Sequence, residues 1–124
     1  MHITEVNIDV SINKRERAHT YQGKVSFCND RKPLYFCGTC KPDILPDGIS
    51  EYEYTIMYAI LTAIDECYKL GYKELLIKHP YAGLEDLWNP YIRVTNLISY
   101  KFGNQVKRYV RNGMKIIFQE EIML

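Results

Sequence analysis

A carboxylate interrupts a stretch of this sequence that is otherwise patterned for burial. In VNIDVSIN, residues 6–13, hydrophobic side chains alternate with polar ones, and Asp9 stands among the polar positions. Alternation with a period of two residues is typical of a strand that has one face in the core. Asp9 is therefore a candidate functional group, and its role depends on what the rest of the chain brings near it.

The four cysteines offer a second kind of chemistry. Cys37 and Cys40 have Cys-x-x-Cys spacing, and with Cys28 and either Cys67 or a histidine they could complete a tetrahedral zinc site. Only one such pair exists, however, and Cys28 and Cys67 lie in apolar patterns. We therefore expect buried free thiols, without a disulfide framework, because the thiols of an intracellular protein are usually reduced.

Basic residues form two groups that could contact phosphates. They are Lys14, Arg15, Arg17, Arg31 and Lys32 in two loops, and Lys101, Lys107, Arg108 and Arg111 in the last helical pattern. Contacts of this type position a protein on nucleic acid. A solvated surface is the alternative, because acids such as Glu16 and Asp30 stand among these residues.

A third group is aromatic. Tyr81, Trp88 and Tyr91 lie close together in the sequence. Such rings could stack on a base or anchor a protein partner. Alternatively, they simply cap a small core.

The composition is that of an ordinary globular protein. The 124 residues are 47% hydrophobic and 25% charged, so we expect a single domain over residues 1–124. The formal net charge of +1 provides no general basic field. No apolar run approaches the roughly 20 residues of a membrane helix, and no secretory leader opens the sequence. We expect a cytoplasmic protein, in a cell or a host cell, that does not bind membranes.

The first half of the pattern predicts three strands and a helix. Residues 3–12, 20–28 and 32–38 are strand-like, and short links make them an antiparallel meander. A loop rich in Pro, Gly and Asp follows. Ser50 and Glu53 then have capping-box spacing in front of an apolar stripe that ends near Gly71, as expected of a long helix.

The second half predicts helices between two further strands. Residues 74–79 form a short strand, 82–88 a brief helix, 92–111 a second long helix that Gly103 could interrupt, and 114–122 the last strand. The resulting order predicts an α/β fold with a five-stranded mixed sheet. Three antiparallel strands come first, and two strands joined through helices lie parallel to the first strand.

This order resembles the ribonuclease H fold, and three segments carry the resemblance. IDVSIN (8–13) is similar to the family's first-strand motif, Asp-Gly-Ser followed by an aromatic residue and Asn: Asp9, Ser11 and Asn13 match, and Val10 replaces the Gly. GYKELLIKHPYAGLEDLW (71–88) resembles the segment from strand four into the next helix, especially in bacterial ribonucleases H that carry a viroplasmin-like domain. FGNQVKRYVRNGMKIIFQEE (102–121) resembles the last helix and fifth strand.

The resemblance implies a centre in which carboxylates hold two Mg²⁺ ions about 4 Å apart and cleave the RNA strand of RNA/DNA hybrids. Asp9 stands at the first carboxylate position. Counting back from Gly71 without gaps puts Ile56 at the second position, whereas counting forward from the helix cap puts Glu53 there. We prefer the ungapped count. The two differ by about one helical turn, near 5 Å of rise.

The other two carboxylates of the family have no clear counterpart. After strand four the chain has Pro80, preceded by His79, and a histidine replaces a Mg²⁺ carboxylate poorly. The fourth position lies beyond the fifth strand, where Glu120 and Glu121 are nearby but belong to the strand pattern itself. We therefore expect a degenerate active site.

These observations favour a catalytically inactive ribonuclease H-like module that binds nucleic acid or a protein and needs no cofactor, such as an adaptor or inhibitor of a phage or mobile element. Its nucleic-acid partner would be an RNA/DNA hybrid or a structured RNA. The expected contact residues are Ser11, Asn13, Lys14, Arg15, Arg17, Tyr81 and Trp88.

Two alternatives remain open. The chain could be an active nuclease that uses Mg²⁺ or Mn²⁺, held by Asp9, Glu53 and one unconventional ligand such as His79 or Glu85. It could instead be a structural or oligomerising domain that forms a homodimer through its exposed third strand.

Overall fold

Seven helices and strands make up the described part of the computed structural model, which covers residues 3–13, 18–27, 32–40, 51–81, 84 and 97–121. In chain order they are β1 (Thr4–Asn13), β2 (Ala18–Ser26), β3 (Leu34–Cys40), α1 (Glu51–Lys69), β4 (Glu74–His79), α2 (Leu97–Arg111) and β5 (Lys115–Glu120). The predicted strand 74–79 has the bounds of β4. The predicted helix at 82–88 lies outside the described residues except for Leu84, and so do residues 92–96 of the predicted second long helix.

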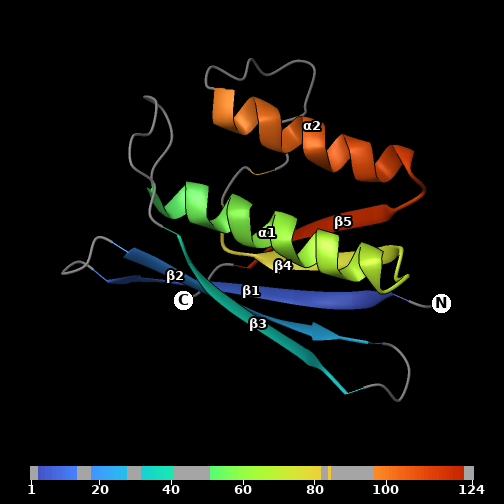
Figure 1. Ribbon diagram of the computed structural model, residues 1–124, viewed down its shortest axis with the longest axis horizontal. Coiled ribbons are helices and arrows are strands. Elements are labelled where there is room, and N and C mark those ends of the chain that lie inside the picture. The colour runs from blue at the N-terminus through green and yellow to red at the C-terminus, as the bar shows by residue number, and fades with distance from the viewer. Residues whose placement is uncertain are drawn as a thin grey trace.

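The five strands form one sheet in the order β3-β2-β1-β4-β5 (Figure 1). β2 is antiparallel to β1 and to β3, whereas β4 is parallel to β1 and to β5. The predicted mixed sheet is therefore confirmed, with β1 at its centre. β4 can lie parallel to β1 because the helix α1 carries the chain back along the sheet before β4 begins.

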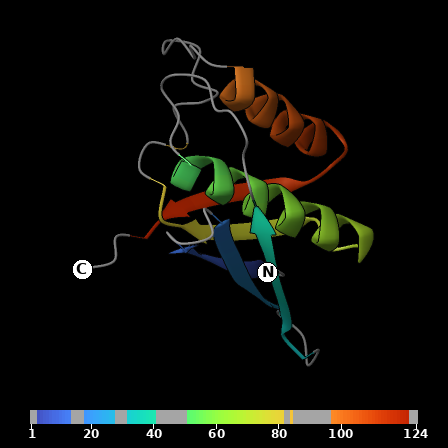
Figure 2. The ribbon, with the colours of Figure 1, turned by 60° about the vertical axis from the view of Figure 1, so that its left-hand side comes forward.

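Both described helices lie on the same side of the sheet, with α1 against the strands and α2 beyond it (Figures 1 and 2). The apolar stripe of α1 makes most of the core, and Ile56, Ile60 and Ile64 are fully buried. Val6 and Ile8 meet this stripe from β1, because alternate residues of a strand share a face. Within the described ranges, no helix is both long enough and apolar enough to cross a membrane.

Glycines end both helices, and the sequence predicts the first of these ends near Gly71. Gly71 has a φ of 86° after α1, and the N–H of Tyr72 donates to the carbonyl of Cys67 at 2.9 Å. Gly113 closes α2 in the same way, with a φ of 98°. Left-handed backbone of this kind is inexpensive only for glycine. The predicted interruption at Gly103 is wrong, because α2 continues through this buried residue, and a glycine within a helix weakens it without breaking it.

Two glycines in the strands make room for aromatic rings on the α1 face of the sheet. Gly23 pairs with Phe36 across β2 and β3, and Gly38 pairs with Tyr21. A Cβ atom on Gly23 would lie 2.1 Å from Cζ of Phe36, and one on Gly38 would lie 2.2 Å from the hydroxyl of Tyr21. These ring-over-glycine pairs favour the observed register between β2 and β3.

Candidate functional site

The candidate site lies where the parallel strands end beside the beginning of α1. The last pair between β1 and β4 joins Asn7 to Lys78, so Asp9 lies beyond it on β1. His79 ends β4 and pairs with Glu120 of β5. Since parallel strands end at the same edge of a sheet, the topology gathers Asp9, His79 and Glu120 at one edge, as is common for ligand sites of α/β proteins.

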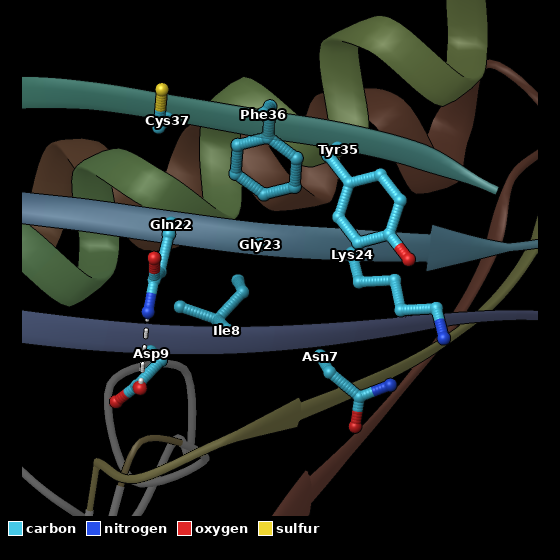
Figure 3. Close-up of a pocket in the computed structure, with 9 residues that line it drawn as sticks. All are labelled: Asn7, Ile8, Asp9, Gln22, Gly23, Lys24, Tyr35, Phe36 and Cys37. Carbon is cyan, nitrogen blue, oxygen red and sulfur yellow. Dashed lines mark hydrogen bonds between the residues drawn. The ribbon is translucent and has the colours of Figure 1, made fainter.

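Asp9 is exposed, and its side chain lies on the face of the sheet opposite the helices (Figure 3). The Nε2 amide of Gln22 donates a hydrogen bond to Oδ2 of Asp9 at 3.5 Å from the neighbouring strand. The charge of Asp9 also reaches the first turn of α1: burial raises the pKa of Tyr52, and the negative charge of Asp9 raises it further. The charge of Asp9 therefore acts on the edge of the sheet where α1 begins.

Tyr81 connects α1 to the end of β4. Its hydroxyl donates a hydrogen bond to Glu53, and burial, this bond and the charge of Glu53 together hold the pKa of Tyr81 far above its usual range. The backbone N–H of Tyr81 donates to Nδ1 of His79 at 3.1 Å. One residue thus occupies both Glu53 and His79 with its hydrogen bonds.

His79 is 1% exposed, and burial lowers its pKa to about 4. Because Nδ1 accepts the Tyr81 N–H, the neutral ring carries its proton on Nε2. Nε2 is buried and has no hydrogen-bond partner among the described residues, and the ring meets Phe118 edge-on with centroids 6.0 Å apart. His79 therefore presents a neutral donor ring to an apolar environment and not a lone pair to an ion.

The two candidates for the second carboxylate position lie in different environments. Ile56 is 0% exposed and belongs to the core. Glu53, at the beginning of α1, is half-buried and reaches the end of β4 through Tyr81. Ile56, which the ungapped count prefers, therefore faces the core. Glu53 lies at the edge where α1 begins.

Glu121, which follows β5 near this edge, is engaged in the sheet. The N–H of Glu121 donates to the carbonyl of His79 at 2.7 Å, which extends the pairing of β4 with β5. Its Oε1 lies 3.9 Å from Nζ of Lys78, which also pairs with Glu5. Within the described ranges, no three His, Cys, Asp or Glu side chains lie close enough to hold an ion.

The cysteines divide into two environments. Cys67 is buried in α1, as expected, and burial together with the charge of Glu66 raises the pKa of its thiol to about 11. Cys37 is exposed, so its predicted burial is wrong: its side chain lies on the face of edge strand β3 that no described helix covers. The side chain of Cys40 and the whole of Cys28 lie outside the described residues.

Most of the predicted nucleic-acid contacts lie wholly or in part outside the described residues. Ser11 and Asn13 follow Asp9 in β1, but their side chains lie outside the described part. Five further candidates also lie outside it, namely Lys14, Arg15, Arg17, Glu85 and Trp88. Of the predicted nucleic-acid contacts, Tyr81 is described with its side chain, and of the candidate metal ligands, Asp9, Glu53 and His79 are.

A hollow of about 530 Å³ lies beside Asp9 on the uncovered face of the sheet (Figure 3). This hollow is not among the predicted sites, although the alternation of residues 20–28 already puts Gln22 and Lys24 on one face. Its polar lining comes from three strands and consists of Asn7, Asp9, Gln22, Lys24, Tyr35 and Cys37.

No protein-family model and no curated protein matches the sequence. Solved structures do match the fold. RNase H1 from the halophilic archaeon Halobacterium salinarum NRC-1 matches with a TM-score of 0.71 and 6% identity, over 97% of this chain and 86% of that one. The N-terminal RNase H domain of rv2228c from Mycobacterium tuberculosis, fused to maltose-binding protein, matches with a TM-score of 0.72 and 12% identity, over 98% and 84%.

A viral structure matches more distantly. The foamy viral protease-reverse transcriptase in complex with dsDNA has a TM-score of 0.56 and 12% identity, over 99% of this chain and 24% of that one. At such low identities the likeness concerns the fold alone. The chain has a ribonuclease H-like fold, which confirms the expectation from its sequence.

Proposed function

We propose that this chain is a ribonuclease H-like module that binds nucleic acid without cleaving it. The observation that carries the proposal is the pair of hydrogen bonds made by Tyr81, one to Glu53 and one to His79. These hydrogen bonds engage Glu53 and His79 at the edge where the resemblance to ribonuclease H implies metal-binding carboxylates. The ligands that remain there are poorly suited to hard cations.

The donor set does not fit two Mg²⁺ ions. Two such ions about 4 Å apart repel each other, and only a cluster of carboxylates offsets this repulsion. Asp9 and Glu53 come from separate elements and already accept hydrogen bonds from Gln22 and Tyr81. The position after β4 belongs to Pro80, and His79 before it is neutral. We therefore assign no metal cofactor.

The surface of α2 supports binding to nucleic acid. Its sequence, LISYKFGNQVKRYVR, contains no acidic residue. Four of its cations are exposed, namely Lys101, Lys107, Arg108 and Arg111. Cations on one helix can contact successive phosphates, and the released counterions then favour binding. Sequence-independent contact with a nucleic-acid backbone follows from this arrangement.

A labelled RNA/DNA hybrid incubated with the protein and Mg²⁺ or Mn²⁺ tests both halves of the proposal. We expect binding that weakens as salt is raised, and an intact RNA strand on a denaturing gel. Lys107→Gln and Arg108→Gln should each lower the slope of log affinity against log salt by about one, as expected for the loss of one phosphate contact. Lys73→Gln, an exposed cation between α1 and β4, is the matched control and should leave binding unchanged.

The alternative is an active nuclease. One observation favours it: the negative charge of Asp9 adds to burial in raising the pKa of Tyr52, the chain neighbour of Glu53, so Asp9 acts electrostatically on the turn that contains Glu53. Cleavage that disappears in Asp9→Asn but persists in the control Glu74→Gln would establish this alternative and overturn the proposal. If the protein binds no nucleic acid at all, a protein partner or a homodimer through edge strand β3 takes its place, and light scattering detects the dimer.

A further inference from the structure

A groove runs between α2 and the edge strand β5. The turn after α2 leads directly into β5, and the helix lies along the strand on the side of the sheet that both helices cover (Figure 1). The groove holds a hollow of about 420 Å³, which is within the range of ligand sites. It is lined by Val106, Lys107, Val110 and Arg111 of α2 and by Ile116 and Phe118 of β5.

The floor of the groove is apolar. Val106 is 5% exposed, whereas Val110, about one turn further along α2, is 48% exposed. Ile116 and Phe118 are half-buried and both face α2, because alternate residues of a strand share a face. Since removing apolar side chains from water is favourable, a partner that covers Val110 and fills the hollow would gain free energy.

The rim of the groove is basic. Lys107 and Arg111 are exposed and stand four residues apart on α2, which is about 6 Å along the helix axis. None of the six described residues that line the groove is acidic, and α2 contains no acidic residue. An apolar floor beside two cations is complementary to a ligand that is both apolar and acidic.

The strand beside the groove has an open backbone. β5 is the last strand in the sheet order, and within the described ranges no other strand pairs with its outer side. The N–H of Lys115 donates to the carbonyl of Lys73 at 2.7 Å, and every second residue of a parallel strand points its N–H and carbonyl to the same neighbour. The N–H and carbonyl of Ile116 therefore point away from β4, toward the open edge.

We propose that an acidic, extended segment of a protein partner adds a strand to β5 and fills this groove. The segment pairs with the N–H and carbonyl of Ile116, which is how peptides bind to open sheet edges. One of its apolar side chains enters the hollow over Val110, and its carboxylates pair with Lys107 and Arg111. This interaction goes beyond the proposed nucleic-acid function, because phosphate contacts use neither an apolar floor nor a strand edge.

The spacing of an extended segment suits the groove. Residues two apart in a strand point to the same face and lie about 7 Å apart. A segment with the pattern acid-x-apolar-x-acid therefore puts one apolar side chain over the floor and a carboxylate on either side of it. Because Lys107 and Arg111 are also proposed phosphate contacts, the segment and a nucleic acid should exclude each other from α2.

The test uses the fluorescein-labelled peptide GSETLTESG, in which both Glu residues and the Leu share a face, and measures fluorescence anisotropy. We expect saturable binding to the wild-type chain. The peptide GSETSTESG, which lacks the apolar side chain, should bind at least about tenfold more weakly. The peptide GSKTLTKSG, which reverses the charges, should bind at least about fivefold more weakly.

Variants of the chain test each part of the groove. Val110→Asp should weaken binding of GSETLTESG by at least about tenfold, and Lys107→Glu combined with Arg111→Glu by at least about fivefold. Arg108→Glu is the matched control for charge, because Arg108 lies on the same helix but does not line the groove. It should change the affinity for the peptide by less than about twofold. Circular dichroism and thermal unfolding verify that each variant folds.

Hydrogen exchange of single amides locates the bound peptide. The amide of Ile116 should exchange more slowly in the complex, because it gains a hydrogen bond at the open edge. The amide of Ile117 points to β4, since it lies two residues after Lys115, and it should exchange at the same rate with and without the peptide. An exchange rate of Ile116 that the peptide leaves unchanged would overturn the strand addition.

The outcomes separate this inference from the proposed function. If GSETLTESG does not bind, or binds no better than GSKTLTKSG, or binds Val110→Asp like the wild type, the groove is not an acidic docking site, and the proposed function stands. If the peptide binds as expected and the RNA/DNA hybrid does not, the proposed function fails and the groove stands. When both are correct, the unlabelled hybrid displaces the peptide. A dimer in light scattering that Val110→Asp dissociates would assign the groove to a second copy and overturn the inference.

Discussion

The backbone N–H of Tyr81 donates a 3.1 Å hydrogen bond to Nδ1 of His79. This bond exists only while Nδ1 carries no proton. Since the hydroxyl of Tyr81 also holds Glu53, the protonation state of one buried ring is linked to the contact between β4 and the first turn of α1. The stability of this edge should therefore depend on pH, on the backbone N–H of Tyr81 and on its hydroxyl.

The free energy of unfolding should fall as the pH decreases from about 6.5 to about 4. Burial lowers the pKa of folded His79 to about 4 from the ordinary 6.5, so the unfolded chain binds the proton first. Above pH 6.5 the titration of His79 takes nothing from the free energy of unfolding, and at most about 3 kcal/mol of this free energy is lost by pH 4. Urea unfolding at several pH values measures it. His79→Phe, which cannot titrate, should remove this part of the slope, and parallel curves for the two proteins would contradict the prediction.

Tyr81→Phe should destabilise the chain by about 1.5 kcal/mol, because a hydroxyl that donates to a carboxylate is lost. A double-mutant cycle with Glu53→Ala should give a coupling energy of about 1 kcal/mol. Chemical unfolding of the four proteins provides the values. Tyr100→Phe, on the exposed surface of α2, is the control and should change nothing. Additive effects in the cycle would mean that the hydroxyl does not hold Glu53.

Gly23→Ala should cost about 1–3 kcal/mol, because the new Cβ would lie 2.1 Å from the ring of Phe36. Adding Phe36→Leu should recover part of this loss, since the smaller side chain leaves the space free. Gly71→Ala is the comparison: its Cβ meets nothing within 4 Å, and its positive φ alone destabilises it. Phe36→Leu should not rescue Gly71→Ala in thermal unfolding. Rescue of both variants would show that the ring is not the cause.

Cys37 should react with iodoacetamide in the folded protein, whereas Cys67 should not. Cys37 is exposed on β3, while burial in α1 raises the pKa of the Cys67 thiol to about 11 and keeps reagents away. Mass spectrometry of peptides from native and urea-unfolded samples distinguishes the two sites. Labelling of Cys67 at the rate of Cys37 under native conditions would show that α1 opens readily.

Local patterns in the sequence were sufficient to predict the main helices and strands and the arrangement of the strands in the sheet. The alternation in VNIDVSIN predicts β1, the repeat of apolar residues at three and four predicts α1, and Gly71 predicts its end. These signals work because strand and helix periods are properties of the backbone. The predicted break at Gly103 was wrong because packing of α2 outweighs the weak helix preference of one glycine.

The sequence by itself determined the fold and the presence of Asp9, Glu53 and Tyr81. Only the tertiary structure decided what these groups meet. Gln22 reaches Asp9 through the register of β1 with β2, and Tyr81 reaches Glu53 because the end of β4 lies beside the beginning of α1. The exposure of Cys37 and the hollow beside Asp9 likewise depend on which face of the sheet the helices cover. Such contacts join residues far apart in the chain, and no local period encodes them.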